Sequence, residues 1–127
     1  MIKKYDSLKA LKTEWLPICQ IAWEEMNIKL SDEPVIVEEQ GRTAEGYYAR
    51  LTVCLAEAES LLDFAELKNL QTREAGTELE RKIWLAAAVR DERSFRDAIE
   101  GLVKAIEIRV NMTQSLLKYH KPFKGGE

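Results

Sequence analysis

Pairs of carboxylates are the first residues that might carry chemistry, because an all-helical protein can hold Mg²⁺ between acids on facing helices. Asp63 with Glu66, and Asp97 with Glu100, each place two acids three residues apart on one face of a helix. Such a site needs a denser pattern, with Glu-x-x-Glu on one helix and Glu-x-x-Asp on another, and neither spacing occurs in the sequence. We therefore expect these acids to be solvated, and we predict no metal site.

Nucleophiles and zinc ligands are also scarce. The two cysteines, Cys19 and Cys54, lie 35 residues apart without a Cys-x-x-Cys pair, and His120 is the single histidine. A zinc site needs more Cys and His ligands than this, and both cysteines fall on apolar helix faces, where a thiol behaves as a small hydrophobic residue. We predict no catalytic residue, no cofactor and a protein that is not an enzyme.

Basic residues gather in two places that are candidates for nucleic-acid binding. In the C-terminal cluster lysines alternate with aromatic rings. Lysines neutralise phosphates and rings stack on unpaired bases, so this cluster suits single-stranded DNA, although an ordinary solvated tail has the same composition. The candidate residues are Arg81, Lys82, Arg90 and Arg93 in the first cluster, and Lys118, Tyr119, Lys121, Phe123 and Lys124 in the second.

Overall charge and hydropathy limit the possible partners. The chain has 127 residues, with 19 Lys and Arg against 22 Asp and Glu, and its net charge of −3 excludes a polycation that coats nucleic acid. The N-terminus lacks the apolar core of a secretory signal. The longest apolar run, residues 83–89, has seven residues, whereas a membrane span needs about 20. We expect a cytoplasmic protein without a membrane span and with reduced thiols.

Apolar residues that recur every three or four positions predict helices throughout the chain. An N-terminal helix is expected within residues 7–30, where Pro17 either kinks the helix near Trp15 and Leu16 or starts a fresh helix. Residues 31–41 contain a proline, a β-branched triplet and four acids without a base. This segment is predicted to be an acidic linker.

Residues 43–120 are predicted to form a helical hairpin. One long helix runs from residue 44 to about residue 73, capped by Thr43, and another runs from residue 91 to about residue 119, capped by Asp91. A short helix between them begins at Thr77, which forms a capping box with Glu80. Residues 121–127 are predicted to be a flexible tail. The expected fold is one all-α domain, an elongated antiparallel hairpin with a short connecting helix and a kinked N-terminal helix.

Self-association is expected because helices of about 30 residues are about 45 Å long, and such a rod buries little of its own apolar surface. The last helix is apolar on two sides, and Arg109 lies where its seam requires an apolar residue. A buried guanidinium must be paired. Arg109 is therefore expected to snorkel to the surface, to bridge to an acid such as Asp63 or Glu66 across the hairpin, or to fix register at an oligomer interface. The predicted oligomer interface is Ile99, Ile106, Arg109, Val110 and Leu117.

The C-terminal part of the chain resembles small helical proteins encoded by bacteriophages near their recombination genes, and it is similar to the UvsY-type recombination mediators. The resemblance covers about the last 50 residues. It lies in the order of a charged capped helix at residues 77–91, an Asp-led turn and a long amphipathic helix with a basic end at residues 116–119. It implies an oligomeric helical protein that binds single-stranded DNA and helps a recombinase to displace the single-strand-binding protein. The acidic segment at residues 31–41 departs from that pattern.

Three functional hypotheses follow. The first is a phage or mobile-element protein that assists DNA recombination by binding partner proteins, such as a recombinase, and single-stranded DNA. The second is a protein-only binder, such as a phage-encoded inhibitor of a host or defence protein, in which the acids of residues 31–41 mimic DNA phosphates. The third is a virion adaptor or assembly chaperone, which oligomerises without nucleic-acid affinity.

Overall fold

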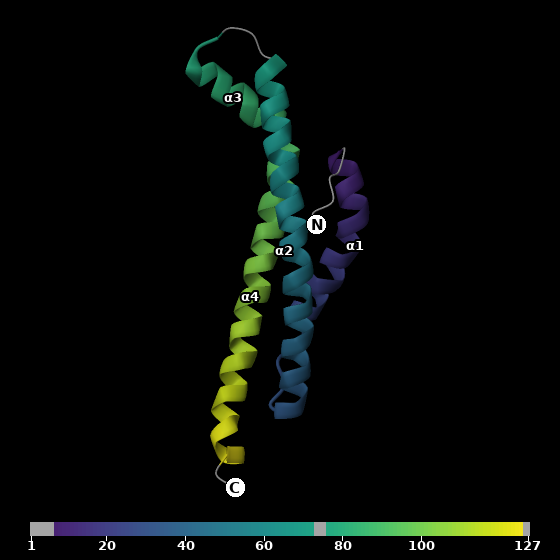
Figure 1. The fold of residues 1–127 in the computed structure, drawn as a ribbon, viewed down its shortest axis with the longest axis vertical. Coiled ribbons are helices and arrows are strands. Elements are labelled where there is room, and N and C mark those ends of the chain that lie inside the picture. Colours follow the sequence, from purple (N-terminus) through teal and green to yellow (C-terminus); the bar gives the residue numbers. More distant parts are fainter. Residues whose placement is uncertain (1–6, 73–75, 126–127) are drawn as a thin grey trace.

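The computed structural model describes residues 7–72 and 76–125, which form four helices and no strand in those two stretches. The helices are α1 (Leu8–Met26), α2 (Pro34–Thr72), α3 (Glu78–Ala88) and α4 (Arg90–Gly125). Figure 1 shows α2 and α4 side by side as a long hairpin, α1 beside part of its length, and α3 at one end. The predicted all-α hairpin with a short connecting helix is confirmed.

The predicted acidic linker is wrong for most of its length, because α2 begins at Pro34. Proline is well suited to the first turn of a helix, where its missing N–H would have no intrahelical partner. The connection from α1 is correspondingly short and is fixed by Gln40. This side chain accepts a hydrogen bond from Ser31 N at 3.0 Å and donates one to Lys29 O at 3.1 Å. The predicted helix start at residue 44 therefore lies ten residues inside α2.

Helix α1 continues through Pro17 as one element, so a fresh helix does not begin there. Its N-terminus is capped by Ser7, whose Oγ accepts a hydrogen bond from Ala10 N at 3.2 Å. Buried residues recur every three or four positions along the face of α1 that packs on the hairpin. They are Leu11, Trp15, Cys19 and Ala22.

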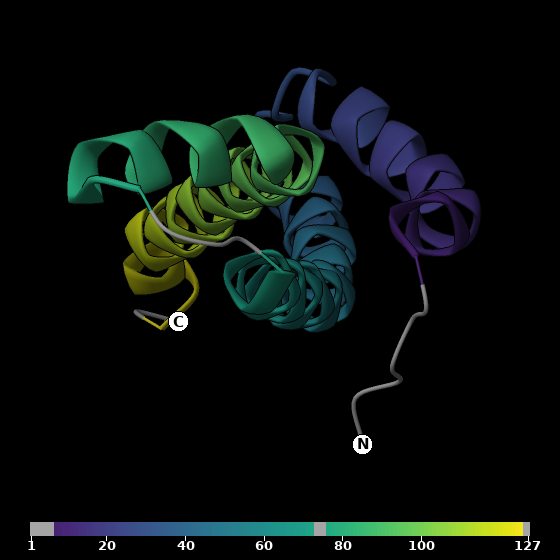
Figure 2. The same ribbon diagram turned by 90° about the horizontal axis from the view of Figure 1, so that it is seen from above.

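The core lies between α2 and α4, with α1 covering one side (Figure 2). Its buried residues on the hairpin include Leu51, Cys54, Ala58, Ile99, Leu102, Val103 and Ile106. A buried hydrogen bond joins α1 to α2 beside these residues: Trp15 Nε1 donates to Glu57 Oε2 at 2.9 Å. This bond fixes how far α1 can slide or rotate on α2.

Helix α3 has the predicted capping box. Glu80 N donates to Thr77 Oγ1 at 3.1 Å, and Thr77 N donates to Glu80 Oε2 at 3.4 Å. None of its residues from 78 to 88 is buried. At this end of the hairpin an ion pair of 3.3 Å between Arg93 and Glu66 joins α4 to α2. Val89, which lies between α3 and α4, is fully buried at this end of the hairpin.

Candidate functional site

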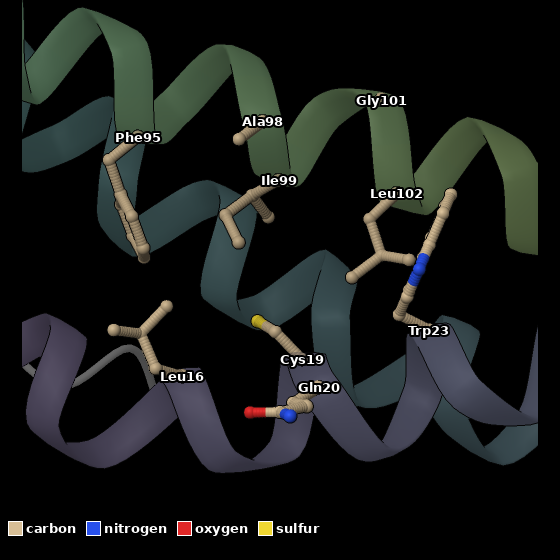
Figure 3. A pocket seen from close by; sticks show the side chains of 9 residues that line it. All are labelled: Leu16, Cys19, Gln20, Trp23, Phe95, Ala98, Ile99, Gly101 and Leu102. Atoms are coloured by element: carbon tan, nitrogen blue, oxygen red, sulfur yellow. The ribbon is translucent and has the colours of Figure 1, made fainter.

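A groove with a mostly apolar lining lies between α1 and α4, and we name it the α1–α4 groove. It encloses about 520 Å³. Figure 3 shows Leu16 and Trp23 reaching from α1 toward α4, with the Cys19 thiol between them. The lining residues are Leu16, Cys19, Gln20, Trp23, Phe95, Ala98, Ile99, Gly101 and Leu102.

The floor of the groove is buried, and its α1 edge is exposed. Cys19, Phe95 and Ile99 form part of the floor and are also buried members of the protein core. Leu16 and Trp23 at the α1 edge remain 49% and 55% exposed. Large apolar side chains held half in water over a packed floor are typical of a surface that binds another protein.

Small residues on α4 keep the groove open. Ala98 is exposed, and a Cβ atom built on Gly101 would meet nothing within 4 Å. A glycine inside a helix costs about 1 kcal/mol relative to alanine, so Gly101 lowers the stability of α4 while leaving room above it. A second helix can approach α4 closely at these two positions.

A second cavity, which we name the Arg109 pocket, continues along α4 beyond Trp23. It encloses about 630 Å³, and Trp23 lines both cavities. Arg109 is 7% exposed, and its Nη1 donates hydrogen bonds to the carbonyl oxygens of Met26 at 3.3 Å and Ile28 at 2.7 Å. Those carbonyls lie at the end of α1, where a helix leaves acceptors without intrahelical donors.

The predicted ion pair of Arg109 with Asp63 or Glu66 is therefore wrong. Glu66 lies toward the other end of the hairpin and pairs with Arg93, whereas the register of α4 places Arg109 beside the end of α1. The spacing of apolar residues in the sequence predicted that Arg109 is buried, and the structure confirms that prediction. Its partner depends on how α1 packs, which periodicity does not specify.

The predicted oligomer interface is largely internal. Ile106 is fully buried and is not available to a partner in this fold. Ile99 is 3% exposed and reaches the surface only as part of the floor of the α1–α4 groove. Arg109 is buried as described above, while Val110 and Leu117 are half-buried. The two apolar stripes predicted for α4 exist, but the short α1–α2 connection lets α1 cover part of the second one.

The two predicted DNA-binding clusters lie at opposite ends of the hairpin. Arg81, Lys82 and Arg90 are exposed near α3, while Arg93 is half-buried in its ion pair. Lys118 and Tyr119 are exposed near the other end of α4, and the side chains of Lys121, Phe123 and Lys124 lie outside the described part of the structure. Arg90 and Lys118 are separated by about 42 Å of helix at 1.5 Å per residue. One chain therefore does not combine the clusters into a single surface.

Carboxylates that were considered as metal ligands are engaged in ion pairs with basic side chains. The Asp97 and Glu100 carboxylates form ion pairs with Arg96 at 2.7 Å and with Lys104 at 3.0 Å. In residues 7–72 and 76–125 no group of three or more acidic, Cys or His side chains is placed to hold a metal ion. No helix among those residues is long and apolar enough to cross a membrane.

The two thiols are both free and buried. They lie close enough to share a hydrogen bond, which together with burial raises the pKa of Cys54 above its ordinary range. A raised pKa lowers the thiolate fraction near neutral pH and makes a thiol a poor nucleophile. The arrangement therefore favours a packing role for Cys54.

Periodicity did not reveal the α1–α4 groove, because the spacing of apolar residues in α1 does not specify which neighbouring helix Leu16 and Trp23 lie beside. The three tryptophans in a chain of 127 residues were the available signal that one ring was left for a partner. No protein-family model, curated protein or solved structure matches this chain.

Proposed function

We propose that this chain is a helical adaptor, which acts by binding another protein chain in the α1–α4 groove. The partner that we propose for the groove is a second copy of the chain. The observation that carries the proposal is the groove itself. A packed apolar floor, half-exposed Leu16 and Trp23 at one edge, and small residues on α4 fit the way an amphipathic helix docks into a groove.

The accessible surface supports self-association. A compact monomer of 14.6 kDa is expected to expose about 6,900 Å², whereas this chain exposes 9,027 Å². The difference, about 2,100 Å², exceeds the roughly 800 Å² that each partner contributes to a standard interface. The elongated hairpin accounts for much of this excess, because it leaves more helix surface open to a second copy than a compact monomer does (Figure 1).

Charge also favours a protein partner over a polyanion at this groove. Gln20 is the one polar side chain among its nine lining residues. The nearby Lys104 is engaged by Glu100, and Asp97 is engaged by Arg96. The ammonium of Lys12 lies 5.9 Å from the ring centroid of Phe95, which lines the groove. A mostly apolar lining with few cations beside it favours apolar side chains over the phosphates of a polyanion.

Substitution of Ala98 by Glu tests the proposal, because it places a charge on the groove without enlarging a core residue. Ala49→Glu is the matched control, since Ala49 is exposed on α2 and lines neither the α1–α4 groove nor the Arg109 pocket. Sedimentation equilibrium should show that the native chain and the control associate. The dissociation constant of Ala98→Glu should be at least about 10-fold higher, which corresponds to a loss of about 1.4 kcal/mol in the free energy of association. Equal association of the two variants would refute docking in the groove.

A second candidate function keeps single-stranded DNA as a partner and places the chain in DNA recombination. The observation in its favour is an exposed Lys118 beside Tyr119, whose side chain is 70% exposed. Fluorescence anisotropy with a labelled strand of about 30 nucleotides, at two salt concentrations, tests it. Binding that weakens with salt and is lost in Lys118→Glu would support this candidate, and no binding at low salt would remove it.

A further inference from the structure

An uncompensated positive charge lies at the inner side of the Arg109 pocket. The Nη1 atom of Arg109 satisfies two carbonyl oxygens at the end of α1, but Nε and Nη2 are buried and have no hydrogen-bond partner. These two nitrogens form one edge of the guanidinium. That edge is the one that binds a carboxylate or a phosphate through two parallel hydrogen bonds.

No acid neutralises this charge within the described residues, because none of the ion pairs found there includes Arg109. Carbonyl dipoles stabilise a guanidinium without cancelling its charge. A buried cation without a counter-ion costs several kcal/mol, whereas an apolar side chain of similar volume would cost little. An anion bound to the guanidinium of Arg109 would offset this cost.

The walls of the pocket are apolar, so the anion must belong to a molecule with an apolar part. Trp23, Ile108 and Met112 line the pocket and are each about half-exposed. Lys29 also lines it and adds a second cation in an exposed position. The volume of about 630 Å³ is within the range of small-molecule sites, about 300–1,000 Å³.

We infer that the Arg109 pocket binds an amphiphile with one acidic head group on one apolar chain. The head group would bind to Nε and Nη2 of Arg109, and the chain would lie against Trp23, Ile108 and Met112. Both nitrogens are buried, so the head group reaches them only when neighbouring atoms of the pocket move aside. This site is separate from the groove floor and does not depend on the proposed function.

Calorimetric titration with three twelve-carbon probes tests the inference in the native chain, below the concentration at which each probe forms micelles. Laurate and dodecyl phosphate carry an acidic head group, and dodecanol has the same chain without a charge. We expect at least one acid to bind at least about 10-fold more tightly than dodecanol. Preference for laurate would indicate a free fatty acid, and preference for dodecyl phosphate a phosphate-headed lipid.

Arg109→Met assigns the effect to the guanidinium, since methionine keeps an unbranched apolar side chain of similar reach. Arg42→Met is the control, because Arg42 is exposed on α2 and lines neither cavity. The preference for acid over alcohol should disappear in Arg109→Met and persist in Arg42→Met. The inference is overturned if dodecanol binds the native chain as tightly as the acids, if no probe binds, or if Arg109→Met retains the preference.

Discussion

Replacing Gly41 with alanine tests how closely α2 and α4 approach at the end of the hairpin away from α3. A methyl group at this position would lie 2.9 Å from Oγ1 and 3.2 Å from Cβ of Thr113. Thr113 is 1% exposed, and its hydroxyl donates to Val110 O at 2.8 Å, so it has little room to move. Gly46 is five residues further along α2, and a methyl group there would meet nothing within 4 Å.

The two substitutions therefore separate helix propensity from steric clash. Alanine in a helix interior gains about 1 kcal/mol over glycine, and overpacking a closely packed contact costs about 1–3 kcal/mol. We expect Gly46→Ala to stabilise the chain by about 1 kcal/mol. Gly41→Ala should be less stable than Gly46→Ala by about 1–3 kcal/mol.

Urea unfolding followed by far-UV circular dichroism measures both free energies of unfolding. Combining Gly41→Ala with Thr113→Ala removes the nearest atom of the clash, so this pair should show a coupling energy of at least about 0.5 kcal/mol. If Gly41→Ala proved as stable as Gly46→Ala, the close approach of α2 and α4 described above would be wrong.

Two other perturbations follow from buried polar contacts. Trp15→Phe removes the indole N–H that donates to Glu57 and should lower the free energy of unfolding by about 1–3 kcal/mol. Trp23→Phe is the control in a half-exposed position and should change the free energy of unfolding by less than about 0.5 kcal/mol. Equal losses for the two variants in urea unfolding would argue against the hydrogen bond of Trp15. Because the hydrogen bond with Cys19 and burial raise the pKa of Cys54, Cys54 should react with a disulfide reagent more slowly than a free thiol at about pH 8. The same hydrogen bond lowers the pKa of Cys19, so mass spectrometry must assign the label to one thiol. Urea should restore the normal rate at Cys54, and fast labelling of Cys54 in the folded chain would contradict its buried position.

Local signals explain which parts of the fold were predictable. The capping box of Thr77 and Glu80 is a contact between residues three apart, and the structure has it as expected. Helical periodicity likewise identified the stripe that contains Leu51 and Cys54, because a helix that packs on another must bury one face. These features depend on neighbours in sequence, so the sequence alone determines them.

Features that depend on distant segments were not predictable in the same way. The acidic stretch after residue 31 contained a proline and β-branched residues, yet α2 begins at Pro34 because Val37 packs in a fully buried position and tertiary contact outweighs weak propensity. The partner of Arg109 depends on where α1 ends, and the α1–α4 groove depends on the side of the hairpin that α1 covers. Each of these is a question of packing between helices.

The mass of the native chain in solution tests the central claim most directly. Light scattering coupled to size-exclusion chromatography, run at increasing protein concentrations, reports whether copies of the chain associate. The α1–α4 groove and the large exposed surface predict a mass that rises from 14.6 kDa toward at least twice that value. A mass that stays at 14.6 kDa up to millimolar concentration would contradict self-association through the groove.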